Sequence, residues 1–542
     1  GDDSSGNGHN FAVLAYVAAD VALDNPENNF STLNRLDRFS GTMTEGNLKY
    51  ANGGSFRAAR GTFEIPTSGK WYFEVLNVNQ TSGSVAIWAG VAAQLTNISA
   101  QPNNSSTTGF YGIYNDSSFG ILNNGAQSSA AGSTVIAANS VLQFAIDIDN
   151  EKLFVGIDND YYSDASTSDG DPSAGTDPTQ SSINLAGFMP FVGCYSNTGI
   201  LNAGQESTFS AVLSASTNTD ANGQGNFKHA PPTDFLALCT ANLPEPTIGP
   251  NSGDGENSTD YFETVLYTGN STDDRTVAVN FAPDWVWLKS RFTSGGSVHS
   301  HFQLDTNRGA TNFLKSDTNA AAADDAATLK AFTSTGFTLG NSDVINDTGT
   351  SYVAWNWIAN GGTATATISE SGNNPAASVQ ANPTAGFSII TYTGTGDAGT
   401  IAHGLGAVPQ MMIIKNRDAA DAWAVYHSEN TAAPATDYLV LNTTAATADA
   451  ATYWADTAPT SSVFTVHDAH NVNADGEKYV AYVFAEIEGY SKFDSYTGNG
   501  NADGVYVHLG FRPAFILIKC VNNQSSWEMH DNKRDPINDV EE

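Results

Sequence analysis

The sequence predicts an all-β protein made of tandem β-sandwich domains, and three observations support this fold class. Only 15% of the 542 residues are charged, and the polarity comes from Asn, Ser, Thr and Gly, which suit strands joined by turns. Short segments alternate between apolar and polar residues with the period of a strand. The C-terminal half repeats one strand-rich pattern, which indicates copies of a single domain.

The region 24–245 has the pattern of one sandwich. In "GKWYFEV" (69–75), Trp71, Phe73 and Val75 should lie on one face of a strand, and Tyr72 and Glu74 on the other. Further strands are expected at 84–92, 188–197 and in a hairpin with arms 141–148 and 152–157. Several short strands separated by turns favour a sandwich.

The rest of the chain is a repeat. Tyr-Thr-Gly occurs at Tyr267, Tyr392 and Tyr496, and each is followed by a Pro that opens a strand ending in Lys. The three Pro-to-Lys strands are "PDWVWLK" (283–289), "PQMMIIK" (409–415) and "PAFILIK" (513–519). A polar-aromatic strand follows in each copy, at 300–305, 423–428 and 527–532. The first two copies close with "YVAWNW" (352–357) and "YVAYVF" (479–484), a strand that the third copy lacks.

These patterns predict the domain boundaries. In order, they are a polar N-terminal segment (1–23), a sandwich (24–245), a linker (246–260), sandwich repeat one (261–363), a linker (364–385), sandwich repeat two (386–490) and a partial repeat three (491–542). The Ala-rich run 319–332 predicts a short helix within repeat one.

The motifs in the first sandwich resemble the SPRY family. "GKWYFEV", "DIDNEKLFVGID", "FMPFVGCYSN", "NAGQESTF" and "FKHAPPTDFLALC" occur in the order of that family, over roughly 200 residues. A polar insertion at about 210–225 splits the ending of the pattern. The resemblance implies a concanavalin-like sandwich that binds through its loops, without fixing the ligand.

The repeats resemble an uncharacterised family found in tail and appendage proteins of marine and cyanobacterial phages. The shared motifs are YTG, Pro-x-hydrophobic-Lys, GFTLG (336–340) and YVAWNW, and "YVAYVF" of copy two departs from the last of them. The resemblance implies a structural or adhesive virion protein of a tail fibre or appendage, which contacts host glycans or spaces other modules. It also implies other virion proteins as partners and a homo-oligomer, with a trimer as the guess, because valency multiplies weak contacts.

Two other function classes stay open. A microbial cell-surface or secreted adhesin would use the same modules. A glycan depolymerase would need a pair of carboxylates in a cleft. No HExxH, GxSxG or phosphate-binding loop occurs, so we expect no enzymatic activity. The net charge of −35 disfavours nucleic acid, and no apolar stretch reaches the length of a membrane span.

The candidate ligand-binding residues are aromatic side chains expected on loops, since a ring face with a polar edge can grip a sugar. They are Tyr111, Tyr114, Tyr161 and Tyr162, and for each a place in the core is an equal alternative. Trp88 lies in an apolar run and is expected in the core.

The acidic stretch 158–178 is a candidate Ca²⁺ site, with Asp158, Asp160 and Asp164 at alternating positions. A solvated loop is the alternative, because the Gly and final Glu of an EF-hand loop are absent. No cofactor is otherwise expected. The histidine pairs "HSH" (299–301) and "HDAH" (467–470) are expected to be exposed polar residues, and Cys194, Cys239 and Cys520 buried free thiols.

The third copy raises a question of its own, because half of a sandwich would expose strand edges and an apolar face around Phe515, Leu517 and Cys520. Three explanations remain open. The sequence is a segment of a longer chain, the third copy folds differently, or a neighbouring subunit adds the absent strand. The third explanation predicts that Phe515 is buried against another chain.

Overall fold

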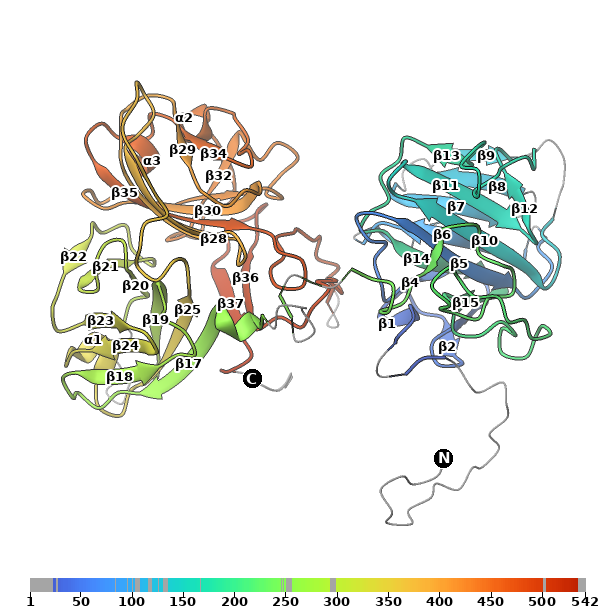
Figure 1. The fold of residues 1–542 in the computed structure, drawn as a ribbon, viewed down its shortest axis with the longest axis horizontal. Helices are drawn as coiled ribbons and strands as arrows, with labels where there is room; N and C mark the ends of the chain where they lie inside the picture. The colour runs from blue at the N-terminus through green and yellow to red at the C-terminus, as the bar shows by residue number, and fades with distance from the viewer. Residues whose placement is uncertain are drawn as a thin grey trace, which may run out of the picture. The chain divides into compact units, whose positions relative to one another are not determined.

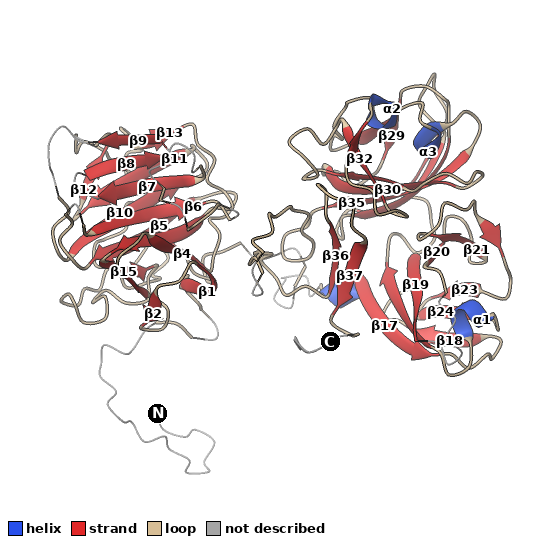
Figure 2. Cartoon of the chain, turned by 180° about the vertical axis from the view of Figure 1, so that it is seen from behind, coloured by secondary structure: helices blue, strands red, loops and turns tan. Residues whose placement is uncertain are grey.

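A computed structural model describes residues 23–25, 28–82, 84–94, 96–99, 101–102, 108–115, 119–124, 126–129, 135–165, 167–244, 246, 248–249, 256–292, 299–500 and 504–534. The described residues form two compact units, one from 1–244 with 496–508 and the other from 245–495 with 509–542. In both units the regular secondary structure is almost all β-strand (Figures 1 and 2). The predicted all-β fold class is therefore confirmed.

The first unit is a sandwich of two antiparallel sheets. The seven-stranded sheet runs β1 (Leu33–Arg38), β4 (Arg57–Gly61), β14 (Met189–Tyr195), β6 (Ala86–Ala92), β7 (Phe110–Asn115), β8 (Phe119–Asn123), β9 (Ala126–Ser129). The other sheet runs β12 (Asp160–Tyr162), β11 (Lys152–Ile157), β10 (Ser140–Asp147), β5 (Lys70–Asn77), β15 (Asn197–Asn202), β3 (Lys49–Asn52), β2 (Thr42–Thr44). Two short strands flank this second sheet, β13 (Gln180–Ser181) beside β11 and β16 (Leu236–Ala237) beside β5.

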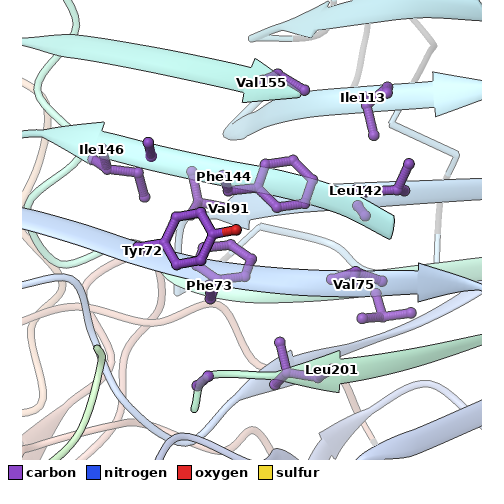
Figure 3. Packing of buried hydrophobic residues seen from close by; sticks show 14 of the residues in the cluster. Tyr72, Phe73, Val75, Val91, Ile113, Leu142, Phe144, Ile146, Val155 and Leu201 are labelled. Atoms are coloured by element: carbon purple, nitrogen blue, oxygen red, sulfur yellow. The ribbon is translucent and has the colours of Figure 1, made fainter. Parts of the chain in front are cut away.

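The core of this unit contains the residues that the alternation of β5 predicts. Phe73 is fully buried and stacks on Phe144 of β10, with ring centroids 4.9 Å apart (Figure 3). Val75 pairs with Leu142, two residues further along the same two strands. The predicted hairpin is confirmed, since β10 and β11 are antiparallel, from the pair of Leu142 and Ile157 to the pair of Asp147 and Lys152.

The opposite face of β5 is also buried, which the alternation alone does not reveal. Glu74 is 0% exposed and accepts hydrogen bonds from the backbone N–H groups of Lys228 and His229, at 2.9 and 2.8 Å. Tyr72 and Asn202 also donate to its carboxylate. Burial raises the pKa of Glu74 to about 7. This carboxylate therefore fixes the segment after β15 onto the outer face of the sheet.

Repeat one, in the second unit, has two sheets. The larger runs β17 (Phe262–Thr268), β25 (Ser351–Trp357), β19 (Trp285–Phe292), β20 (Phe302–Asp305), β21 (Asn312–Lys315), β22 (Ala323–Asp324). The smaller runs β18 (Arg275–Ala278), β24 (Gly336–Leu339), β23 (Leu329–Thr333). The helix α1 (Asp343–Asn346) precedes β25, and a 3₁₀ turn (Ser258–Asp260) precedes β17.

Repeat two has a similar plan, with two more strands in its larger sheet and one fewer in its smaller sheet. Its larger sheet runs β26 (Ala366–Ile368), β27 (Ala377–Asn382), β28 (Phe387–Thr393), β35 (Lys478–Ala485), β30 (Pro409–Asn416), β31 (Ala424–His427), β32 (Asp437–Val440), β33 (Ala448–Asp449). Its smaller sheet pairs β29 (Gly399–Ala402) with β34 (Val463–Val466). Two helices complete it, α2 (Ala451–Trp454) and α3 (His470–Asn473).

Two predicted elements are wrong. The segment 364–385, predicted to be a linker, contains β26 and β27, which extend the large sheet of repeat two. The Ala-rich run 319–332 forms β22 and most of β23 instead of a helix. Pairing with β21 and β24 supplies backbone hydrogen bonds that outweigh the helical preference of alanine.

The Tyr-Thr-Gly motif has the same structural role in both full copies. Tyr267 stacks on Tyr352 and donates a hydrogen bond to the Ile345 carbonyl at the end of α1. Tyr392 stacks on Tyr479 and donates likewise to the Val472 carbonyl in α3. The third motif tyrosine, Tyr496, is 47% exposed. In the two full copies, the motif tyrosine thus joins a helix to the YVA strand.

The described part of the third copy is a hairpin, β36 (Phe515–Lys519) and β37 (Trp527–Asp531). Figure 1 shows it beside β17 and β25 of repeat one. Phe515 packs against Phe262, Trp355 and Trp357 of the same chain, at centroid distances of 5.6–5.9 Å. Phe515 therefore packs on repeat one of its own chain, while Phe515 and Leu517 stay partly exposed.

Candidate functional site

The three copies contact one another through equivalent residues, and we call each such contact a seam. The strand registers define the equivalence, because Trp285, Met411 and Phe515 pair with Asp305, His427 and Asp531 respectively. The same registers make Trp355 of β25 equivalent to Tyr482 of β35. Apolar residues from all three copies together form one cluster between the copies.

In two seams, an aromatic side chain of one copy donates a hydrogen bond to an aspartate–arginine pair of the next. In repeat one, Arg308 Nε lies 2.5 Å from Asp305 Oδ2, and Tyr482 of repeat two donates to that oxygen at 2.7 Å. The first seam therefore joins repeat two to repeat one through a carboxylate that both copies share.

The hairpin repeats this arrangement with a different aromatic residue. Arg534 Nε lies 2.5 Å from Asp531 Oδ2, and Trp355 of repeat one donates to that oxygen at 3.1 Å. In the second seam, repeat one therefore supplies the aromatic donor and the hairpin supplies the carboxylate.

A tryptophan indole joins the copies at a second position, at the start of the polar-aromatic strand. Trp423 of repeat two donates to the Lys315 carbonyl of repeat one at 3.0 Å. Trp527 of the hairpin donates to the Val440 carbonyl of repeat two at 3.0 Å. Lys315 and Val440 are themselves equivalent by register, so both indoles donate to the same carbonyl position of the neighbouring copy.

Repeat one has His301 at this position in place of a tryptophan, and the residues around it line a cleft of about 750 Å³. Repeat one contributes Trp287, Lys289, Ser290, Arg291, His301, Ser316, Asp317 and Ser351. The other two copies contribute Leu441, Asn442, Thr443, Thr444, Leu517, Ser526, Trp527, Met529 and Arg534. The cleft thus forms where the smaller imidazole replaces the indole of the other copies.

Hydrogen bonds fix the floor of the cleft. Trp287 Nε1 donates to His301 Nδ1 at 3.0 Å, and the His301 backbone N–H donates to Asp317 at 3.2 Å. Burial, together with the positive charges of Lys289 and Arg534, lowers the pKa of His301 to about 4. His301 is therefore a neutral acceptor at pH 7. Of the histidines expected to be exposed, His470 is exposed, whereas His299, His301 and His467 are only partly exposed.

The walls of the cleft combine half-buried apolar side chains with exposed polar ones. Leu517, Trp527 and Met529 are partly exposed, whereas Thr443 and Thr444 are fully on the surface. Aromatic and aliphatic faces beside hydroxyl and amide groups suit a ligand with apolar faces and polar edges, such as a sugar.

A second cleft in repeat two, of about 530 Å³, is mostly acidic. Its lining residues are Gln410, Ser428, Glu429, Glu486, Glu488, Lys492, Phe493 and Asp494. Burial and the charges of Asp494 and Glu486 raise the pKa of Glu429. Lys492 pairs with Glu486 at 3.4 Å.

The four candidate tyrosines lie in the first unit and do not come together as one site. Tyr114 is 1% exposed and packs in an apolar cluster with Trp88, so it is a core residue and its ring face is not open to a ligand. Tyr111, Tyr161 and Tyr162 are half-buried. Tyr111 packs on Phe188, and Tyr162 on Phe119. Only these three keep partly exposed rings.

The candidate calcium residues have local structural roles. Asp158 accepts a hydrogen bond from the Val141 N–H at 2.8 Å, and Asp164 from the Thr167 N–H at 2.8 Å. Asp160 begins β12. Among the residues that the structure describes, no three His, Cys, Asp or Glu side chains are grouped to hold a metal ion. The three aspartates therefore do not form a carboxylate cluster.

The sequence motifs did not reveal the cleft, because it forms from three segments that are distant in the chain. Motif spacing alone does not align His301 with Trp423 and Trp527, because His301 follows its motif lysine by 12 residues and the two tryptophans follow theirs by eight. The strand registers show the equivalence. Cys194 and Cys239 are buried free thiols as predicted, whereas Cys520 is exposed.

The geometry defines the second unit as a tandem-repeat β-domain. A family model described as Domain of unknown function (DUF7483) matches residues 257–542, and the chain belongs to that family. No curated protein matches the chain. Within the described residues, no helix has the length and apolar character to cross a membrane.

Solved structures with similarity to the chain include two β-sandwich domains. The SPRY domain of human HERC1 is 10% identical with a TM-score of 0.24, over 31% of this chain and 96% of that one. The carbohydrate-binding module CBM66 from Bacillus subtilis is 11% identical with a TM-score of 0.20, over 32% and 91%.

Proposed function

We propose that the protein is an adhesive, glycan-binding protein whose ligand site is the cleft around His301. The observation that supports this most is the replacement of a seam tryptophan by His301, which opens a cleft lined by Trp527, Thr443 and Asn442. The surrounding seams are held by buried hydrogen bonds, so the site is preorganised.

We also propose a setting for this binding, a virion tail fibre or appendage in which several copies of the chain assemble. The repeat motifs support the setting, and valency would raise the affinity of a shallow site. Mass spectrometry of purified particles tests it. Peptides of this chain in particle fractions support the setting, and their absence contradicts it.

The test of the function is a binding measurement on the whole chain. A glycan array, followed by calorimetric titration of the best oligosaccharide, should give saturable binding. Thr443→Trp places an indole at the exposed rim of the cleft and should abolish binding with unchanged thermal stability. Thr457→Trp, an exposed threonine of the same repeat outside the cleft, is the matched control. Binding that survives Thr443→Trp contradicts the proposed site.

The depolymerase alternative is favoured by one specific observation, the gathering of Glu429, Glu486, Glu488 and Asp494 in the second cleft. A carboxyl group with a raised pKa beside ionised ones can act as a general acid. Incubation with the bound polysaccharide, followed by sizing of the chains, tests it. Shortening that Glu429→Gln abolishes would establish hydrolysis, and chains of unchanged length would exclude it for that polysaccharide.

A further inference from the structure

The charge of the His301 cleft is opposite to that of the chain. Asp and Glu outnumber Lys and Arg by 57 to 22 in the whole sequence. The cleft lining has three basic residues, Lys289, Arg291 and Arg534, and a single acidic one, Asp317. In a protein of net charge −35, a local excess of cations requires a separate explanation.

Hydrogen bonds hold the cations in and beside the cleft in place. Lys289 Nζ donates to the His299 carbonyl, and Lys519 Nζ lies 3.2 Å from the carbonyl of Thr444, a residue of the lining. Arg534 binds Asp531 through Nε and the Met529 carbonyl through Nη2. When Lys519 and Asp531 are added to the lining residues, the count is four cations and two carboxylates, Asp317 and Asp531. The positive excess therefore remains.

Among the described residues, the two lining cations that form no ion pair with a carboxylate, Lys289 and Arg291, differ in exposure. Lys289 is half-buried, and burial lowers its pKa while the nearby Asp317 opposes that effect. Arg291 is exposed on the rim. An ammonium has three donors, and a guanidinium offers a planar fork that matches a carboxylate or a sulfate. A partly desolvated ammonium gains most from an anionic partner.

We propose that the cleft selects an anionic glycan, one that carries carboxylate or sulfate groups, through Lys289 and Arg291. This specificity rests on the proposed glycan-binding function and names the ligand class for the same site. The aromatic and hydroxyl groups contact the sugar ring, and the two cations contact its charged substituent.

The experiment compares three oligosaccharides of similar length by calorimetric titration of the whole chain: an oligogalacturonate, a sulfated galactan fragment and a neutral galactan fragment. The expected result is that at least one anionic sugar binds about tenfold more tightly than the neutral one, because each charge-assisted contact is strong. The two anionic arms distinguish carboxylate from sulfate recognition.

Matched variants assign the preference to residues. Lys289→Gln/Arg291→Gln should remove the preference, measured as the ratio of the affinities for the anionic and the neutral sugar. Lys330→Gln is the control, because Lys330 pairs with Asp273 and Asp274 outside the cleft. Equal binding of all three sugars by the natural chain overturns the anionic specificity and leaves the glycan-binding function standing. Binding of none of the sugars overturns both, and a preference that survives in the double variant overturns the assignment to these two residues.

Discussion

The two aspartate–arginine seams use equivalent residues but differ in burial. Asp305 and Arg308 are both 0% exposed at their side chains, whereas Arg534 is 27% exposed beside a buried Asp531. The Tyr482 hydroxyl both donates to Asp305 and accepts from Arg308 at 3.2 Å. The Trp355 indole only donates, and Arg534 lies over its ring at 5.0 Å.

This comparison shows how one motif serves two purposes. The closed triangle of Tyr482, Asp305 and Arg308 removes three polar groups from water and makes the contact between the full repeats rigid. The open pair at the hairpin keeps Arg534 beside the cleft. Breaking the buried pair should therefore cost more free energy of unfolding than breaking the exposed one.

Arg308→Met should have the largest effect. It leaves the Asp305 carboxylate buried without its cation, so the free energy of unfolding should fall by about 3–5 kcal/mol. Chemical denaturation of the whole chain, followed by tryptophan fluorescence, measures the change. A loss below about 1 kcal/mol would show that the triangle is not a principal contact of the seam.

Arg534→Met, the equivalent change at the hairpin, should cost about 2 kcal/mol, since water reaches the guanidinium and compensates part of the loss. Hydrogen exchange should show faster opening of β36 and β37, with the strands of repeat two unaffected. An effect equal to that of Arg308→Met would remove the distinction between the seams.

Tyr482→Phe removes one hydrogen bond to Asp305 while Arg308 stays in place. The expected loss is about 1–2 kcal/mol, the value of a hydrogen bond to a charged group. Combined with Arg308→Met in a double-mutant cycle, it should be strongly non-additive, because both side chains contact one carboxylate. Additive losses would mean that the two contacts act independently.

Acid should affect the hairpin seam through Asp531. Burial alone raises the pKa of this carboxyl, but the hydrogen bonds from the Arg534 backbone and guanidinium outweigh burial and hold it below the usual range. A depressed pKa contributes stability above the unfolded-state value of 3.8, and that stability is lost as the pH falls through the folded value. The protection factors of the hairpin amides, which are corrected for the intrinsic exchange rate, should therefore fall below about pH 4, and a flat profile of protection against pH would contradict this role.

The sequence was sufficient for the fold class and for finding the repeats, because alternation and motif spacing are local properties. Phe73 and the hairpin of β10 and β11 lie as their patterns predict. The burial of Glu74 and the pairing of 364–385 into a sheet depend on segments that are distant in the chain. The cleft is missed for the same reason, since its walls come from three copies and no single segment contains its pattern.

The central claim is that the cleft is a seam position left open where His301 replaces a tryptophan. Trp287→Ile/His301→Trp reproduces in repeat one the Ile413 and Trp423 of repeat two. Titration of this variant with the best glycan ligand of the natural chain tests the claim most directly. Lost binding with an equal or higher melting temperature is predicted, whereas unchanged affinity in a folded variant would contradict the claim.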